Sequence, residues 1–138
     1  MRCDLDSFIR AQILLGPLVQ SAPSRPFSPH LEQLPQARSA VYIAVDDAGE
    51  TLYVGSVARD SLQSLRRRVE EHLREHYKAT AWAKVWVLPL QDQLCVEEVR
   101  WAEGRVGHFL KPTDNRRLPR LGKFSSVSQP AGCTRRTA

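Results

Sequence analysis

The sequence has no long hydrophobic run and few cysteines. These two features argue against a membrane-spanning protein and against a fold held by disulfides or thiolate-bound zinc. Near the N-terminus the longest apolar run covers residues 11–15, and no stretch approaches the roughly 20 apolar residues needed to span a bilayer. The three cysteines, Cys3, Cys95 and Cys133, are far apart and form no C-x-x-C pair. A thiolate zinc site and a disulfide framework are therefore not expected. We expect a cytoplasmic protein with no membrane segment and no signal segment.

Acidic residues are missing from the C-terminal end of the chain. From residue 116 onward there are six Lys/Arg and no Asp/Glu, whereas residues 40–115 hold 10 basic and 12 acidic residues, a net charge of −2. The overall charge of +5 is thus a feature of the C-terminal flank. Such a flank can be a solvated tail, or an arm that grips phosphates without reading sequence.

The length of 138 residues and the hydrophobic content of 42% are those of one globular domain with a single core. Residues 1–39 read as an extension, with a helix over 7–15 and a Pro- and Ser-rich segment over 21–35. This extension could dock a partner protein or cover a sheet edge. Residues 40–118 form the expected domain, and residues 119–138 a basic, flexible tail.

Residues 40–110 alternate between strand-like and helix-like patterns. Residues 41–45 and 51–55 are β-rich, and the turn-like residues 46–49 between them predict a hairpin. Apolar residues at helical spacing predict helices over 62–77 and 96–110, with a third strand over 82–90 between them. The order β-β-α-β-α predicts an α+β fold, in which helices flank a small three-stranded antiparallel sheet.

Two tyrosines of the predicted hairpin are expected to lie on one face of the sheet. If the loop is residues 46–49, Val45 lies opposite Glu50 and Tyr42 lies opposite Tyr53. A slip of one residue would separate the two phenols, because successive side chains of a strand point to opposite faces.

Glu103 interrupts the apolar stripe of the last predicted helix, which runs through Val96, Val99, Val106 and Leu110. A carboxylate that faces a core is costly unless it is paired or binds a metal. Glu103 is therefore either a residue at the rim of the stripe that reaches solvent or an arginine, or part of a functional site.

Four motifs in the predicted elements resemble those of the GIY-YIG nucleases. The strands carry Ala40-Val41-Tyr42 and Tyr53-Val54-Gly55, and the helix after them carries Leu65, Arg68, Val69 and His72 at the L-x-x-R-hydrophobic-x-x-H positions. Glu103 on the last helix is followed by Pro112 and Asn115. This spacing is similar to the nuclease domain of the nucleotide-excision-repair incision subunit and to small stand-alone members. Ala40 replaces the usual glycine, and the loop before Arg68 is longer than in compact members.

The resemblance implies an endonuclease that hydrolyses phosphodiester bonds in nucleic acid, with DNA favoured over RNA. It implies one divalent ion, Mg²⁺ or Mn²⁺, held by Glu103. Tyr42 would act as the general base or orient it, Tyr53 would position water, and Arg68 would neutralise phosphate charge. The implied catalytic set is Tyr42, Tyr53, Arg68, His72, Glu103 and Asn115. The expected nucleic-acid-binding residues are Arg59, Arg67, Arg116, Arg117, Arg120 and Lys123.

Two alternatives stay open from the residues alone. His72 and His76 fit an H-x-x-E-H pattern of inverted zinc proteases, although such enzymes need a third ligand and a larger fold. The chain could also be a catalytically inactive module that keeps the nuclease-like fold to bind nucleic acid or a partner. The sequence predicts neither substrate specificity nor oligomeric state.

Overall fold

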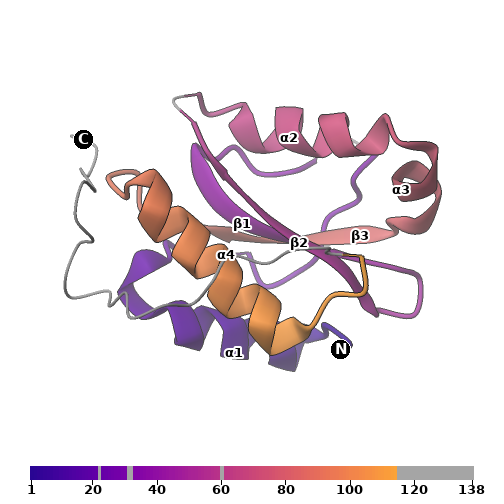
Figure 1. Ribbon diagram of the computed structural model, residues 1–138, viewed down its shortest axis with the longest axis horizontal. Helices are drawn as coiled ribbons and strands as arrows, with labels where there is room; N and C mark the ends of the chain where they lie inside the picture. Colours follow the sequence, from indigo (N-terminus) through magenta and orange to yellow (C-terminus); the bar gives the residue numbers. More distant parts are fainter. Residues whose placement is uncertain (22, 31–32, 60, 115–138) are drawn as a thin grey trace.

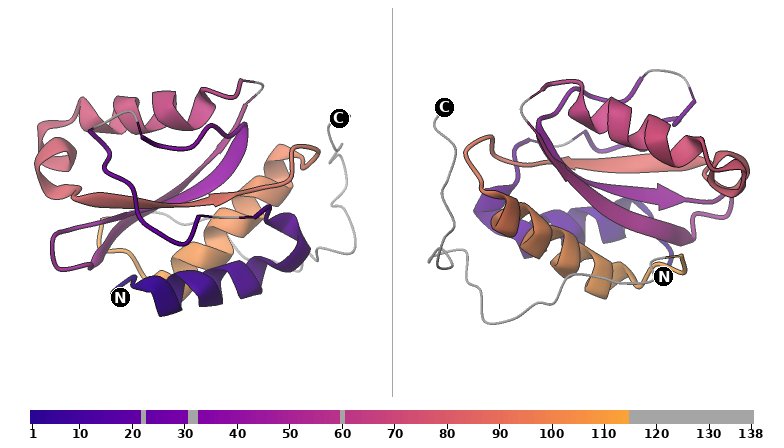
Figure 2. Two further views of the ribbon diagram at one scale, coloured as in Figure 1. Left: turned by 180° about the vertical axis from the view of Figure 1, so that it is seen from behind. Right: turned by 45° about the horizontal axis from the view of Figure 1, so that its top comes forward.

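The computed structural model describes residues 1–21, 23–30, 33–59 and 61–114. A three-stranded antiparallel sheet of order β2-β1-β3 lies between two helical layers (Figure 1). The strands are β1 (Ser39–Val45), β2 (Thr51–Ala58) and β3 (Lys84–Pro89). One layer holds α2 (Ser64–Leu73) and α3 (His76–Ala81), and the other holds α1 (Leu5–Leu15) and α4 (Val96–Leu110) (Figure 2). The predicted α+β class with a three-stranded antiparallel sheet is confirmed.

The hairpin of β1 and β2 has a different register from the predicted one. Tyr42 pairs with Gly55 and Tyr53 pairs with Ala44, with an irregularity between Ala44 and Val45. The prediction that Tyr42 faces Tyr53 was therefore wrong by two residues. Because side chains alternate with a period of two, this shift keeps both phenols on one face of the sheet.

The turn explains the register. The Asp46 side chain accepts hydrogen bonds from the backbone N–H groups of Ala48 and Glu50, both at 2.9 Å, so Asp46 and Glu50 close the loop. Val45 then pairs with Thr51 instead of Glu50, and the extra residue on β2 is taken up as a bulge.

The helix expected over residues 62–77 is two helices. α2 ends at Leu73, and Glu75 has an extended backbone (φ −79°, ψ 118°) before α3 begins at His76. A continuous helix would carry Lys78 away along its axis, whereas the break turns α3 back toward α2. This break therefore determines the surroundings of His72.

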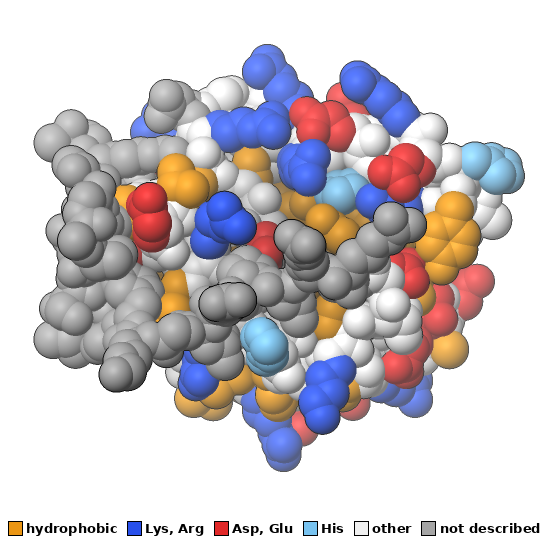
Figure 3. Space-filling model, viewed as in Figure 1, with side chains coloured by type: hydrophobic (Ala, Val, Ile, Leu, Met, Phe, Trp, Pro, Cys, Tyr) orange, Lys and Arg blue, Asp and Glu red, His pale blue; other side chains and the backbone are white. Residues whose placement is uncertain are grey.

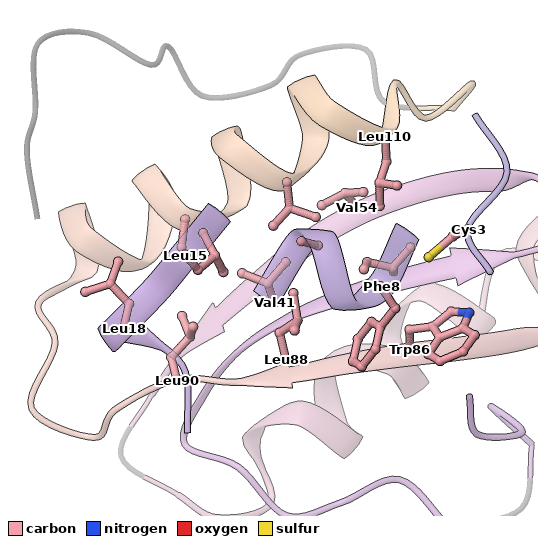
Figure 4. Close-up of a cluster of buried hydrophobic side chains, with 14 of the residues drawn as sticks. Cys3, Phe8, Leu15, Leu18, Val41, Val54, Trp86, Leu88, Leu90 and Leu110 are labelled. Atoms are coloured by element: carbon pink, nitrogen blue, oxygen red, sulfur yellow. The ribbon is translucent and has the colours of Figure 1, made fainter. Parts of the chain in front are cut away.

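α1 and α4 cover one face of the sheet with a continuous apolar core (Figure 4). Asp4 caps α1 by accepting from the Ser7 N–H at 2.9 Å, and Gly16, with φ of 56°, ends the helix before a proline. The ring centroids of Phe8 on α1 and Trp86 on β3 lie 4.7 Å apart. α1 is thus held against the sheet by its own apolar stripe.

The segment after α1 runs along the outer edge of β3. Phe27 exchanges backbone hydrogen bonds with Val85, both 2.8 Å long, and Gln20 N–H donates to Pro89 O at 2.8 Å. These contacts satisfy backbone groups that a bare edge strand would expose. No helix in the described ranges is long and apolar enough to cross a membrane.

α4 has the bounds that the sequence predicted, but its buried face differs. Val96 is 48% exposed, and Ala102 is buried in the core instead. Glu98 and Cys95 form a capping box at the start of the helix, with the Glu98 carboxylate accepting from the Cys95 N–H at 3.2 Å. Cys3 is a free, buried thiol.

Candidate active site

The two tyrosines of the hairpin pack over Gly55. Their rings stack with centroids 6.1 Å apart, and Tyr42 is fully buried. A Cβ atom built on Gly55 would clash with the Tyr42 hydroxyl and would lie 2.7 Å from Tyr53 Cε1. Gly55 has no positive φ, so space and not backbone conformation requires the glycine. The glycine of the second tripeptide therefore makes room for both phenols.

His72 links this pair to the helical layer. Its Nε2 lies 2.8 Å from the Tyr42 hydroxyl oxygen, and its Nδ1 lies 2.9 Å from Nζ of Lys78 on α3. The imidazole also packs on Tyr53 and Trp82, with ring centroids 4.7 and 5.0 Å away. With an exposed fraction of 5%, His72 is a buried, doubly engaged side chain.

Arg68 lies on the rim of the site and is paired within its own helix. Its Nη1 donates to Glu71 at 2.8 Å, and Arg59 approaches the same carboxylate at 3.4 Å. Arg59 and Arg68 are thus neighbours on one surface and share an acidic partner. Acidic and basic side chains are intermixed on this part of the surface, above the sheet (Figure 3).

Glu103 approaches β2 from the opposite face. Its carboxylate accepts a hydrogen bond from the Ser56 hydroxyl at 2.7 Å. Ser56 follows Gly55 on the strand, so its side chain points away from the tyrosines and toward α4. No described strand pairs with β2 on its outer side. Tyr53 on one face of β2 and Glu103 on the other therefore flank this outer strand.

The titratable groups of the site influence one another's pKa values although they lie on opposite faces of the sheet. Burial raises the pKa of Tyr42 far above its usual range; Tyr53 adds to the rise and Arg68 opposes it. Burial also raises the pKa of Tyr53, and the charge of Glu103 raises it further. Burial outweighs the charge of Arg68, so the free protein holds Tyr42 as a phenol.

The pKa values of His72 and Glu103 are shifted by burial as well. Burial, followed by the positive charges of Lys78 and Arg68, lowers the pKa of His72 to about 4, so the imidazole is neutral near pH 7. Burial raises the pKa of Glu103, and the hydrogen bond from Ser56 partly offsets that rise. Each shift disfavours the charged form, as a partly desolvated site requires.

Several expected site residues are not part of this group. Arg67 lines a separate cavity of about 690 Å³ beside α2, together with Arg66 and Arg74. Among the described residues, no three His, Cys, Asp or Glu side chains are grouped to hold a metal ion. The zinc pattern is therefore not assembled there, and His76 is exposed. The remaining expected residues lie outside the described ranges: Asn115, Arg116, Arg117, Arg120 and Lys123.

The described chain nevertheless ends next to the site. After α4, the backbone N–H of Thr113 donates to Thr51 O at 3.2 Å, and that of Asp114 donates to Leu52 O at 2.7 Å. These bonds hold residues 113–114 against the start of β2, directly before Tyr53.

Three residues of the site were missed by the sequence analysis. Lys78 contacts His72 only because α3 turns back, which no local pattern predicts. Ser56 could have been found, because strand alternation directs its side chain to the face opposite Gly55. Trp82 is 1% exposed and packs against His72, with the ring centroids 5.0 Å apart.

Comparison of the chain with protein-family models, with curated proteins and with solved structures found no match. The resemblance to GIY-YIG nucleases therefore depends on the motif residues themselves. The structure adds that Tyr42, Tyr53, Arg68, His72 and Glu103 are arranged around one strand.

Proposed function

We propose that this chain is a metal-dependent endonuclease of the GIY-YIG type that hydrolyses phosphodiester bonds in nucleic acid, with DNA as the favoured substrate. The observation that carries the proposal is the buried Tyr42–His72 hydrogen bond of 2.8 Å beside Tyr53, with Glu103 near enough to influence both phenols. A purely structural core has no need for two phenols, an imidazole and a desolvated carboxylate in one place. Perturbed titratable groups gathered in this way are typical of functional sites.

Glu103 is the described residue that fits a divalent cation. Mg²⁺ commonly binds through one or two carboxylates and keeps several water molecules, so a single glutamate is a sufficient protein ligand. The partly buried carboxylate is held by Ser56 but has no cationic partner within hydrogen-bonding distance among the described residues. A bound ion would add its charge to the more distant ones of Arg100 and Arg68, and would polarise the scissile phosphate.

The proposed reaction is an in-line attack of water on the phosphorus atom. The water oxygen forms the new P–O bond, its proton passes to a base, and the P–O bond to the leaving sugar oxygen breaks. Tyr42 and Tyr53 orient the water, and Tyr42 in its phenolate form accepts the proton. Arg68 faces the negative charge that gathers on the phosphate oxygens, where a preorganised donor commonly contributes about 3–4 kcal/mol.

A substrate must change two features of the free site. The raised pKa of Tyr42 requires nearby positive charge before its phenolate can form. Arg68 must divide its donors between Glu71 and the phosphate; an arginine has five N–H donors, so both contacts are compatible. We expect both changes to occur when substrate and cation bind together.

A nicking assay on supercoiled plasmid tests the proposal. With Mg²⁺, the wild-type protein should relax and linearise the plasmid, and EDTA should stop it. Glu103→Gln removes the charge but keeps the shape, and should lower the cleavage rate more than about 100-fold. The matched control is Glu97→Gln, an exposed glutamate on the same helix, which should cleave like the wild type. Equal rates for Glu103→Gln and Glu97→Gln would refute the assignment.

The second candidate is an inactive module that binds nucleic acid with the same fold. Two observations favour it: Tyr42 is a protonated phenol, and Arg68 is already paired with Glu71. Neither side chain is in the state that catalysis would need. Such a protein would bind nucleic acid in a salt-dependent way and would leave the plasmid intact with Mg²⁺ or Mn²⁺. Linear, branched and single-stranded substrates extend the same assay.

A further inference from the structure

Lys78 is held in a way that a surface lysine is not. Its side chain is 15% exposed, although α3 has no buried residue. Nζ lies 2.9 Å from His72 Nδ1 and 3.2 Å from the Glu75 carboxylate, and it sits 5.0 Å from the centroid of the Tyr53 ring. The ammonium group is thus placed by an imidazole, a carboxylate and an aromatic face together.

These contacts fix the direction of the hydrogen bonds around His72. An ammonium group has three donors and no acceptor, so His72 Nδ1 must accept from Lys78 through its lone pair. The hydrogen of the neutral imidazole is then on Nε2, which is the atom 2.8 Å from the Tyr42 hydroxyl oxygen. His72 therefore donates, and the oxygen of Tyr42 accepts.

We propose that Lys78 is a positioning residue that fixes the tautomer of His72, so that the imidazole donates its Nε2 hydrogen to Tyr42. The catalytic meaning of this contact rests on the proposed nuclease function. A donor on the phenol oxygen stabilises the phenolate and so works against the effect of burial. Because its Nδ1 is engaged and its Nε2 carries the hydrogen, His72 cannot take the proton of Tyr42. His72 orients the base and is not itself the base.

The charges around His72 come from every element packed on it. Lys78 lies on α3, Arg68 and Glu71 on α2, and Glu75 between these helices; the two phenols lie on the sheet. The two cations outweigh the two carboxylates and add to the effect of burial, which keeps the imidazole neutral near pH 7. A single neutral tautomer is therefore expected in the free protein.

Nitrogen-15 NMR of the histidine side chains tests the inference without substrate. The chain has four histidines, and the His72 signals are assigned by their loss in His72→Gln. In the wild-type protein, Nε2 of His72 should carry the hydrogen at pH 7, and Nδ1 should be bare. A hydrogen on Nδ1, or on both nitrogens, would overturn the inference whatever the variants do.

Three lysine variants separate the role of Lys78 from general charge. Lys78→Met keeps the aliphatic stem but removes the ammonium group, so the hydrogen of the His72 imidazole should no longer be confined to Nε2. The pKa of His72 should also move up toward its ordinary value near 6.5. Lys78→Arg keeps a cation that can only donate, and should preserve the Nε2–H tautomer. Lys84→Met changes an exposed lysine on β3 and should leave the His72 spectrum unchanged. An unchanged His72 spectrum in Lys78→Met would refute the role of Lys78.

Cleavage by the same variants tests the consequence for catalysis. Lys78→Met should cut at least about 10-fold more slowly than Lys84→Met, with Lys78→Arg partly restored, because the wrong tautomer of a base-orienting imidazole is costly. Equal rates for Lys78→Met and Lys84→Met would overturn that consequence. Failure of the nuclease proposal would give a different set of results. Cleavage would survive Glu103→Gln or would be absent from the wild type, whereas the NMR result for His72 would be unaffected.

Discussion

Replacing Gly55 with alanine separates two physical accounts of this glycine. Gly55 lies in β2 with no positive φ, so its backbone conformation suits any residue. Conformational entropy alone then predicts that Gly55→Ala stabilises the protein by about 0.4–1 kcal/mol, through the unfolded chain. The packing of the two phenols predicts the opposite sign.

The size of the packing effect follows from the distances. The added Cβ would lie 2.5 Å from Tyr42 Cζ and 2.7 Å from Tyr53 Cε1, whereas unstrained carbon contacts are about 3.5–4.0 Å apart. Overpacking of this kind commonly costs about 1–3 kcal/mol. Since the entropy gain offsets part of this cost, we expect a net loss of roughly 1–2 kcal/mol. With a slope of about 1.5 kcal/mol per molar urea, the unfolding midpoint should fall by about 1 M.

Urea unfolding followed by circular dichroism measures this midpoint. The Gly55→Ala substitution should cost less in a Tyr53→Ala background, where one of the two rings is gone, and the coupling should exceed about 0.5 kcal/mol. A midpoint of Gly55→Ala at or above that of the wild type would refute the packing argument. So would an equal loss in both backgrounds, because the cost would then come from something other than the phenols.

Three further predictions follow from groups around the site and in α1. Ser56→Ala removes the hydrogen bond that lowers the pKa of Glu103, so cleavage should need more Mg²⁺ than in the wild type. The increase should be larger at pH 6 than at pH 8, because more of the carboxylate is then protonated. Equal Mg²⁺ requirements of Ser56→Ala and the wild type would contradict this prediction. The pKa of Asp4 is lowered in the folded state by its bonds to Ser7, so its stabilisation is present above the unfolded pKa and is lost as pH falls. Unfolding midpoints of the wild type and Asp4→Ala should differ at pH 7 and converge near pH 2, and a constant gap would argue against the cap. Burial raises the pKa of Cys3 to about 12, so alkylation followed by peptide mapping should find it unreactive in the folded protein; rapid labelling would contradict its position.

Periodicity predicted the elements whose patterns are local. Residues 96–110 alternate apolar and polar residues at helical spacing over four turns, and α4 has the predicted bounds. The runs around Tyr42 and Tyr53 were found by their β-rich composition and the turn residues between them, because β1 is buried on both faces and shows no alternation. The α+β class followed from the order of these elements.

The register and the helix break could not be read in this way. The hairpin register depends on Asp46, whose side chain bonds Ala48 and Glu50 and shifts the pairing by one residue; the bulge after Val45's partner adds the second. The apolar spacing of residues 62–77 continues across Glu75, so it gives no sign that the chain leaves the helix there. Both features are set by hydrogen bonds and backbone turns, which leave little trace in hydrophobic patterning.

The sequence by itself determined which side chains are candidates for chemistry: two tyrosines in paired strands, an arginine and a histidine one turn apart, and a glutamate on a helix that is otherwise apolar at that phase. Only the tertiary structure decided what each of them touches. It placed Gly55 beneath both phenols, Ser56 on Glu103 and Lys78 on His72. The reason is physical: residue type fixes which protons and charges a side chain can offer. Burial and neighbours brought from distant parts of the chain fix the direction of each hydrogen bond and the sign of each pKa shift.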